Sequence, residues 1–316
     1  MPPAPFLSRA VGRLRAAVRR AAPGRGFAGW SEPRRPDCPW CGSGRLGPGP
    51  APADARRPSP WPALPAVRRP RGRPAATPDA RPPAAPLDVA DLPAGTVPFD
   101  TCADCGHVFQ NPRRYLWRDP CLTAEELTPY PHGITGPTRR LAARRHRSAA
   151  RALLSFPEPE SWLDVGTGDG DFPAVARGFF PYTAFDGVDA GHRVVRAQAA
   201  DRVEEAHLGR LTDPHLTARL RDRYDVVTML HHLEGAPDPR AELRAALTVL
   251  RPGGHLLLDL TDPRAGRWTP PARPAPLHLP PRANIEAELR ANGCTPLTTK
   301  ARAPLSGAYR VLARRD

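Results

Sequence analysis

The sequence has no long apolar run, and this absence excludes two classes of protein. Nowhere in the 316 residues is there an apolar stretch long enough for a membrane-spanning helix or for the core of a secretory signal. Lysine is almost missing too, because only Lys300 among the 46 basic residues is a lysine. We therefore expect a cytoplasmic protein without a membrane span, whose basicity reflects an arginine-rich composition.

The positive charge is a weak guide to a partner. The formal net charge is +14, which by itself suggests nucleic acid or an anionic surface. Residues 1–100, however, hold 16 arginines against 7 acidic residues, so +9 of this charge lies there and only +5 in the rest. The excess is concentrated in low-complexity sequence, and this disfavours a nucleic-acid partner.

The N-terminal third carries two low-complexity features. Residues 42–100 contain 15 prolines and few large apolar side chains, so a disordered insertion is predicted over about 43–97. Before it, Leu7, Val11, Leu14 and Val18 lie at helical spacing among arginines. This spacing predicts either a short basic amphipathic helix that contacts a membrane surface or partner, or a frayed tail, which is the favoured interpretation.

Four of the six cysteines form two CxxCG units, "CPWCG" and "CADCG". Each unit suits a turn that points two thiolates at one metal ion, and two units together indicate structural zinc rather than a redox pair or an empty, degenerate site. His107 is either a substitute ligand or an ordinary strand residue, the second being favoured, and Cys121 and Cys294 are expected to be packing or incidental thiols. The predicted zinc ligands are Cys38, Cys41, Cys102 and Cys105.

A glycine-rich turn follows the apolar segment "SWLDV" in "LDVGTGDGDF". The segment is typical of a buried parallel strand, and "DFPAVARGFF" after the turn predicts a helix, so the three make a nucleotide-binding βα unit. A second strand, "TAFDGVD", ends at Asp189, 19 residues past Gly170. An acidic side chain at that place suits ribose hydroxyls.

The charges of this turn argue against a pyrophosphate. Its pattern is GxGxG rather than GxGxxG, and Asp164, Asp169 and Asp171 lie around it. Two like charges about 4 Å apart repel by roughly 4 kcal/mol at an effective dielectric of 20. The turn therefore favours an adenosine without phosphate whose other end is cationic, as in S-adenosylmethionine.

These motifs resemble the class I S-adenosylmethionine-dependent methyltransferases over roughly residues 138–313. "FDGVDAG" is similar to the second motif of that family, "YDVVTMLHHLEGAPDP" to its fourth strand with the loop beside the methyl donor, and "LRPGGHLLLDL" to its fifth strand. The resemblance implies that the donor is bound by Asp164, Gly166, Thr167, Gly168, Asp169, Gly170, Asp189, Ala190, Met229 and Leu230.

The N-terminal part resembles bacterial methyltransferases that begin with a CxxCG…CxxCG zinc ribbon followed by an "NP" step, here "HVFQNP". One departure is visible, because the loop "AHLGRLTD" lacks the acidic residue that many members use near the adenine. The expected organisation is a basic tail (1–35), a zinc ribbon with its insertion (36–112), a connector (113–137) and a methyltransferase domain (138–316).

The expected fold is α/β: a doubly wound, seven-stranded Rossmann-like sheet that ends in an antiparallel hairpin, preceded by a small zinc ribbon. Independently of the resemblance, "RAELRAALTVLRPGG" places Leu243, Ala246, Leu247 and Leu250 on one helical face. "HLLLDL" is then a buried strand, and "CTPLTTK" and "AYRVLA" predict the closing hairpin.

Candidate catalytic residues follow the fourth predicted strand. His231 and His232 emerge where an acceptor meets the methyl group, and either imidazole suits a general base near neutral pH. The alternative is that both only pack or hydrogen-bond in the loop, and the sequence does not decide between them. Glu234 is a weaker candidate, His255 is expected to be structural, and His278 is expected to be structural or at the rim of the acceptor pocket.

Three functions remain open. The leading hypothesis is S-adenosylmethionine-dependent methylation of a small-molecule acceptor in secondary or sugar metabolism, with zinc as a structural metal. A ribosomal or transfer RNA methyltransferase is the second, although the chain lacks an (N/D)PPY motif. The third is a non-catalytic zinc-ribbon binding protein with a degenerate methyltransferase fold, which the intact glycine turn and Asp189 disfavour.

Overall fold

A computed structural model describes residues 29–31, 33–49, 98–116, 137–264, 276–297 and 307–316. Three sequence predictions fall wholly or mostly outside these ranges: the N-terminal amphipathic helix, residues 50–97 of the insertion predicted over about 43–97, and Cys121. Within the described ranges, no helix is both long and apolar enough to cross a bilayer.

The larger sheet has seven strands in the order β12-β13-β10-β9-β6-β7-β8. All its pairings are parallel except those of β13, which runs antiparallel to both β10 and β12. The predicted seven-stranded sheet with an antiparallel C-terminal hairpin is therefore confirmed. The strands are β6 (Ser161–Val165), β7 (Ala184–Asp189), β8 (Ala206–Leu208), β9 (Tyr224–Leu230), β10 (Leu250–Thr261), β12 (Cys294–Leu297) and β13 (Ala308–Arg315).

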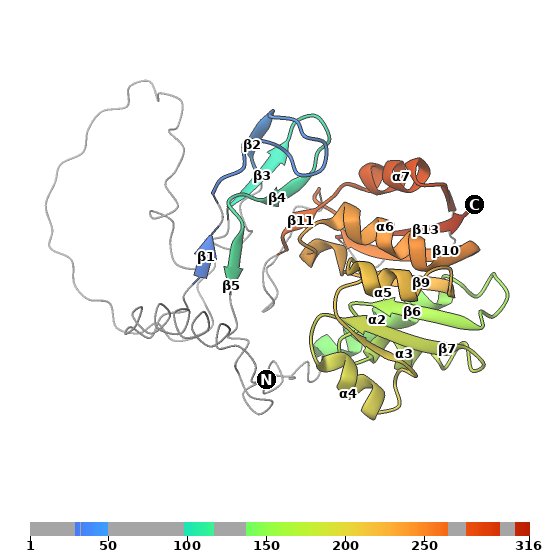
Figure 1. Cartoon of the computed structure of the whole chain (residues 1–316). Helices are drawn as coiled ribbons and strands as arrows, with labels where there is room; N and C mark the ends of the chain where they lie inside the picture. Colours follow the sequence, from blue (N-terminus) through green and yellow to red (C-terminus); the bar gives the residue numbers. More distant parts are fainter. Residues whose placement is uncertain (1–28, 32, 50–97, 117–136, 265–275, 298–306) are drawn as a thin grey trace, which may run out of the picture.

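Helices cover both faces of this sheet (Figure 1), with α2, α3 and α4 on one side and α5, α6 and α7 on the other. Asp213 accepts backbone N–H bonds at the start of α5, and Asp238 does so at the start of α6. A proline follows each aspartate, so the sequence itself predicts where both helices begin. The helices are α2 (Pro137–Arg151), α3 (Asp171–Ala176), α4 (Arg193–Ala199), α5 (Pro214–Arg219), α6 (Pro239–Val249) and α7 (Arg282–Ala291).

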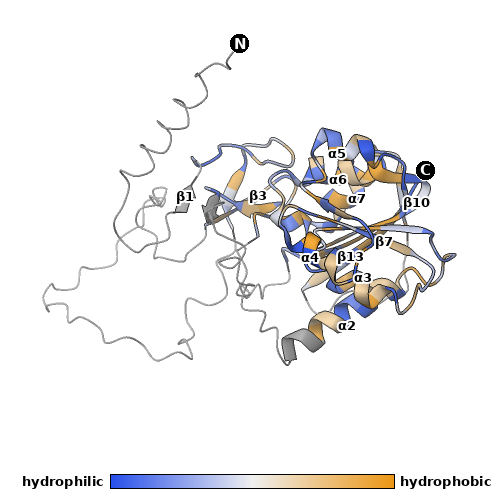
Figure 2. Ribbon diagram, turned by 60° about the horizontal axis from the view of Figure 1, so that its bottom comes forward, coloured by the Kyte–Doolittle hydropathy of each residue, from blue (hydrophilic) through white to orange (hydrophobic). Residues whose placement is uncertain are grey.

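Two apolar cores fill the spaces between sheet and helices, and Figure 2 shows hydrophobic residues along the strands and the inner helix faces. Under α2 and α3, the Trp162 ring packs against three phenylalanines, with ring centroids 5.3 to 5.7 Å apart. On the other side, α6 buries Leu243, Ala246 and Leu247, as its predicted face requires. Each large apolar side chain buried in this way stabilises the fold by about 1.5–3 kcal/mol.

A smaller antiparallel sheet carries the cysteines, in the order β11-β4-β3-β2. Gly42 and Gly106 have φ of +75° and +69°, and each closes its CxxCG turn by donating to the carbonyl of the first cysteine. The strands are β2 (Leu46–Pro48), β3 (Phe99–Cys102), β4 (Val108–Gln110) and β11 (His278–Leu279); β1 (Gly29–Ser31) pairs separately with β5 (Arg114–Leu116).

Strand β11 was not predicted, because "PLHLPP" has prolines on both sides and was interpreted as a loop. In the structure His278 pairs with Phe109 and Leu279 with Val108, so a segment late in the chain completes the N-terminal sheet. Trp40 and Phe109 also belong to the same apolar cluster as α6 and α7. The two sheets therefore share one core.

Candidate active site and cysteine cluster

The glycine turn between β6 and α3 depends on glycine at three positions. Gly166, Gly168 and Gly170 have φ of +74°, +56° and +73°, a region that other residues avoid. A Cβ on Gly166 would collide with the ring of His232, and one on Gly170 would lie 3.0 Å from the Cβ of Ala197. The turn thus brings backbone close to both the His232 loop and α4.

Asp189 anchors this turn at the carboxyl end of β7. Its Oδ2 accepts from the Gly168 amide at 2.9 Å, and its Oδ1 accepts from the Gly191 amide at 2.8 Å. The predicted position at the end of the second strand is therefore occupied by a carboxylate that faces the glycine turn.

The charge around the turn differs from the expectation. Asp169 pairs with Arg193 at 2.7 Å and Arg196 at 3.0 Å, and Asp171 pairs with Arg202 at 2.8 Å. Although burial favours its neutral form, the hydrogen bonds from Arg193 hold the pKa of the Asp169 carboxyl below its usual range. Two of the three aspartates thus have arginine partners, which the sequence analysis did not foresee.

The third aspartate, Asp164, lies beneath the turn. It is buried and accepts a hydrogen bond from the Thr228 hydroxyl at 2.7 Å. Burial raises the pKa of Asp164 to about 6. Thr167, next to it in the turn, packs over β7 so closely that a Cβ on Gly187 would approach its methyl group to 2.6 Å.

A pocket opens where β6, β7 and β8 end. It contains Asp189 and Ala190 of the predicted donor site, whereas the Met229 and Leu230 side chains pack in the two apolar cores. Contacts from Met229 and Leu230 to a ligand there would have to come from the backbone. The pocket is lined by Val165, Val188, Asp189, Ala190, Gly209, Arg210, Leu211, His232 and Glu242.

His231 is held in one orientation after β9. Its φ is +56°, its amide donates to the Asp259 carbonyl at 2.8 Å, and its Nδ1 donates to Glu234 Oε1 at 3.0 Å. Glu234 is buried and also accepts from the amide of Thr261 at 2.8 Å. His231 Nε2 is buried and has no hydrogen-bond partner, whereas the pocket lining contains His232 and not His231.

Two opposing effects set the proton affinity of His231. Burial by itself lowers the pKa of the imidazole, but the hydrogen bond and negative charge of Glu234 outweigh it, so the pKa lies above its ordinary value. The same contact holds the pKa of Glu234 below its usual range against the effect of burial. Glu234, a weak catalytic candidate in the sequence analysis, thus orients His231, a stronger candidate.

His232 faces the pocket together with an acidic side chain that the sequence analysis missed. Its Nε2 lies 3.8 Å from Glu242 Oε2, too far for a hydrogen bond, and both atoms are buried without a partner. The signal was present in the sequence, since Glu242 lies four residues before Ala246 on the apolar face of α6. Unpaired buried polar atoms of this kind require an explanation such as a bound ligand.

The four cysteines of the two CxxCG units meet in one cluster, as predicted, and all four sulfurs lie within 4.8 Å of one another. The Cys38–Cys105 and Cys41–Cys102 sulfur separations are 3.7 and 3.5 Å. Tetrahedral zinc with Zn–S bonds of about 2.3 Å requires roughly 3.8 Å between sulfurs, so the residues fit this metal. Burial raises the pKa of Cys38 to about 11, and four thiolates packed this closely need a cation.

The other histidines are not in the pocket. His107 Nδ1 lies 3.7 Å from Cys38 Sγ, beside the cluster and outside the four-sulfur set. His278 is fully buried in the smaller sheet, where it pairs with Phe109. His255 packs on Phe156 with ring centroids 4.1 Å apart, in the structural role expected for it.

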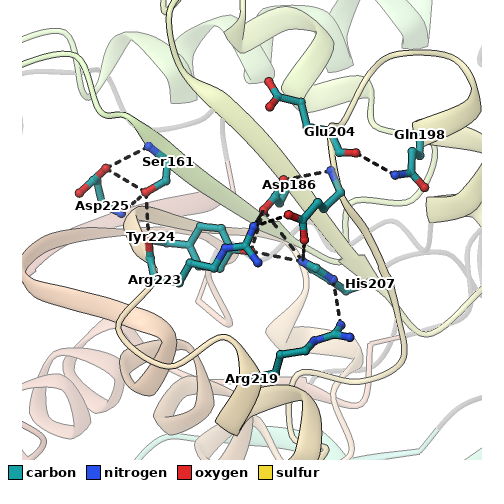
Figure 3. A network of polar contacts seen from close by, with 10 residues as sticks. Ser161, Asp186, Gln198, Glu204, His207, Arg219, Arg223, Tyr224 and Asp225 are labelled. Atoms are coloured by element: carbon teal, nitrogen blue, oxygen red, sulfur yellow. Dashed lines mark hydrogen bonds and ion pairs between the residues drawn. The ribbon is translucent and has the colours of Figure 1, made fainter.

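A second group of potential metal ligands, Asp186, Glu205 and His207, lies near the amino ends of the strands (Figure 3). Arg223 donates to Asp186 at 3.2 Å and to Glu205 at 2.5 Å, and the Tyr224 hydroxyl donates to Asp186 at 2.8 Å. The carboxylates are therefore already neutralised by a cation of the chain. This group is an ion-pair network that ties β7, β8 and β9 together.

A sheet of this order, with a glycine turn after β6 and an acidic residue at the end of β7, defines an α/β enzyme that binds a nucleoside at the carboxyl ends of its strands. A family model described as a methyltransferase domain matches residues 138–299. The chain therefore belongs to this family, the class I S-adenosylmethionine-dependent methyltransferases.

Curated relatives match part of the chain. The ubiquinone biosynthesis O-methyltransferase of Aeromonas salmonicida is 35% identical over 101 residues, which are 31% of this chain and 41% of that protein. The enzyme of the same name from Serratia proteamaculans is 32% identical over 108 residues, 34% of this chain and 44% of that protein. The chain thus spans about two fifths of the length of the curated relatives it matches.

Among solved structures, the N-methyltransferase NodS from Bradyrhizobium japonicum, in complex with S-adenosyl-L-homocysteine, is similar, with a TM-score of 0.43 and 16% sequence identity. The match covers 55% of this chain and 87% of that one.

Proposed function

We propose that the protein transfers a methyl group from S-adenosylmethionine to a small-molecule acceptor. The observation that carries this proposal is the pocket at the carboxyl edge of the sheet, whose lining includes Asp189, His232 and Glu242. Membership of the methyltransferase family supports the donor. The names of the curated relatives, which are ubiquinone biosynthesis O-methyltransferases, support a small acceptor, and a place in secondary or sugar metabolism is part of the proposal.

In the donor site, Asp189 accepts from the ribose hydroxyls while its other bonds hold the glycine turn. The turn contributes backbone at Gly166 to Gly170, with Thr167 and Asp169 fixed between them, and Asp164 supports it from below. Ala190, Gly209 and Leu211 give the adenine an apolar wall, which needs no acidic residue from the loop after β8.

On the acceptor side, His231 is the stronger candidate for a general base. When bound, the donor would supply an electrophilic methyl group on a sulfonium centre, with a neutral thioether as its leaving group. Glu234 keeps the His231 proton on Nδ1, so Nε2 takes the acceptor proton. His232 remains the second candidate, with Glu242 in place of Glu234.

We assign structural zinc to Cys38, Cys41, Cys102 and Cys105, on the fit of the sulfur separations to tetrahedral coordination. Four reduced cysteines of this kind are typical of a reducing compartment, which supports a cytoplasmic location. Metal analysis of the purified protein tests this assignment, and a zinc content well below one ion per chain contradicts it.

The test of the main proposal has two steps. Calorimetry with S-adenosylmethionine is expected to show binding, and no binding at hundreds of micromolar donor contradicts the donor assignment. The purified enzyme is then incubated with labelled-methyl donor and extract fractions of the source organism, with Asp189→Ala as the control. Label in a small-molecule fraction supports the acceptor class, whereas label only in RNA or protein overturns it.

A further inference from the structure

A buried polar chain runs from the cysteine cluster toward the active site. His278 Nε2 lies 2.9 Å from Arg113 Nη2, His278 Nδ1 lies 3.2 Å from His107 Nε2, and His107 Nδ1 lies 3.7 Å from Cys38 Sγ. The two imidazoles are fully buried and nearly parallel, with an interplanar angle of 14° and centroids 5.1 Å apart. Because both imidazoles are fully buried and hydrogen-bonded, their positions are fixed by the surrounding side chains.

The hydrogen bonds that join Arg113, His278, His107 and Cys38 can have only one donor-to-acceptor order. Arginine has N–H donors and no acceptor, so His278 Nε2 must accept from Arg113. The proton of neutral His278 is then on Nδ1 and is donated to His107 Nε2. This leaves the His107 proton on Nδ1, where it points at Cys38 Sγ as an N–H···S hydrogen bond. A sulfur that binds zinc carries negative charge, and this bond stabilises it.

The same residues hold the turn that carries the catalytic candidates, the 3-10 helix η2 (Leu233–Gly235). Arg113 Nη1 donates to the Pro237 carbonyl at 2.9 Å, just after η2. The amide of Leu277, next to His278, donates to the Glu234 carbonyl at 2.7 Å. Glu234 is the residue that orients His231.

We infer that Arg113, His278 and His107 are positioning residues that couple the cysteine cluster to η2, so that metal binding in the smaller sheet organises the acceptor side of the active site. The inference rests on the proposed function only in assigning η2 to the acceptor side. The contacts themselves run through Cys38, His107, His278 and Arg113 to the backbone on both sides of Glu234.

Zinc release tests the first half of the coupling. The full chain, loaded with zinc, is mixed with a chromogenic chelator, and His107→Phe is expected to release zinc roughly 10- to 100-fold faster, the range typical of a lost hydrogen bond to a metal ligand. His107→Gln keeps an acceptor and a donor and is expected to restore slow release. The matched control is His255→Phe, which makes the same exchange on β10. Equal release from the wild type and both His107 variants overturns the inference.

Hydrogen–deuterium exchange tests the second half without any methyl transfer, so it is independent of the proposed reaction. Removal of zinc from the wild-type chain is expected to speed amide exchange in residues 231–237 by roughly 5- to 150-fold, the range of typical coupling energies. Residues 206–208, at the far edge of the sheet, serve as the reference and are expected to change little. Unchanged exchange in residues 231–237, or an equal increase in both segments, contradicts the coupling. Calorimetry with the donor on the same samples reports separately on the proposed function.

Discussion

At the scale of single residues, the two histidines after β9 differ in the carboxylate each one faces. Glu234 accepts a hydrogen bond from His231 and raises the pKa of the imidazole, whereas Glu242 lies 3.8 Å from His232 without a hydrogen bond. We expect Glu234→Gln to lower the pKa of His231, which histidine ring NMR measures directly. The acidic limb of the pH–rate profile is expected to move to lower pH in the same variant.

Glu242→Gln is the matched control for that experiment. If the rate profile moves in Glu242→Gln and stays in Glu234→Gln, then His232 and not His231 is the base. Both variants keep the size and shape of the side chain, so the comparison isolates its charge.

The His231–Glu234 pair also makes stability depend on pH. Because the pKa of His231 is raised in the folded state, its contribution is fully present below the ordinary histidine pKa and is lost as the pH rises through the raised value. Because the pKa of Glu234 is lowered, its contribution is present above the ordinary glutamate pKa and is lost as the pH falls through the lowered value. Urea denaturation of the wild type and Glu234→Gln at several pH values is expected to show a difference that shrinks on the alkaline side.

The proposed role of Asp189 in donor binding can be tested separately from folding. A hydrogen bond to a charged group contributes about 1.5–3 kcal/mol, and each 1.4 kcal/mol corresponds to about tenfold in affinity. We therefore expect Asp189→Ala to bind S-adenosylmethionine roughly 10- to 100-fold more weakly in calorimetry. Glu286→Ala, which removes a carboxylate paired with Arg282 and Arg290 on the surface of α7, is expected to bind normally.

At the scale of the element, alanine substitutions at two glycines with nearly the same φ test the packing of the glycine turn. Gly166 and Gly293 have φ of +74° and +71°, but only Gly166 faces a side chain, the His232 ring. Alanine at either position costs about 1–2 kcal/mol of backbone strain. We expect Gly166→Ala to lose more stability than Gly293→Ala in thermal denaturation, because its Cβ also displaces the His232 ring, and only Gly166→Ala to lose donor binding. Normal donor binding by Gly166→Ala contradicts the assigned packing of the turn.

The elements also show which structure is predictable from sequence. Strong local signals, such as the apolar face of α6 and the glycine turn after β6, gave the correct elements. The pairing of Asp169 with Arg193 and Arg196 was missed because these arginines lie on α4, and only the folded chain brings α4 beside the turn. Strand β11 was missed because its two residues become a strand only by pairing with β4.

At the scale of the whole molecule, the two sheets behave as one body. Arg240 of α6 donates to the Trp40 carbonyl at 2.9 Å and pairs with the buried Glu288, and Trp40 lies in the same apolar cluster as α6 and α7. The seven-stranded sheet followed from the alternation of strands and helices along the sequence. The union of the two sheets did not, because it depends on contacts between residues about 200 positions apart, such as Arg240 and Trp40.

This shared core predicts one unfolding transition. Removal of zinc with a chelator is expected to lower the melting temperature of the entire chain in differential scanning calorimetry, since each 1 kcal/mol lost lowers it by roughly 2–4 °C in a domain of this size. The chelator saturated with zinc beforehand is the control. A main transition that stays at its original temperature while a small one shifts indicates two independent bodies.

The pairing of β11 with β4 has a consequence for the order in which the protein is made. His107 and His278 are 171 residues apart, and translation begins at the N-terminus. The cysteine-bearing sheet therefore lacks its outermost strand until nearly the whole catalytic sheet has left the ribosome. The four cysteines of the cluster can come together early in translation, but His278 is synthesised only after most of the enzyme.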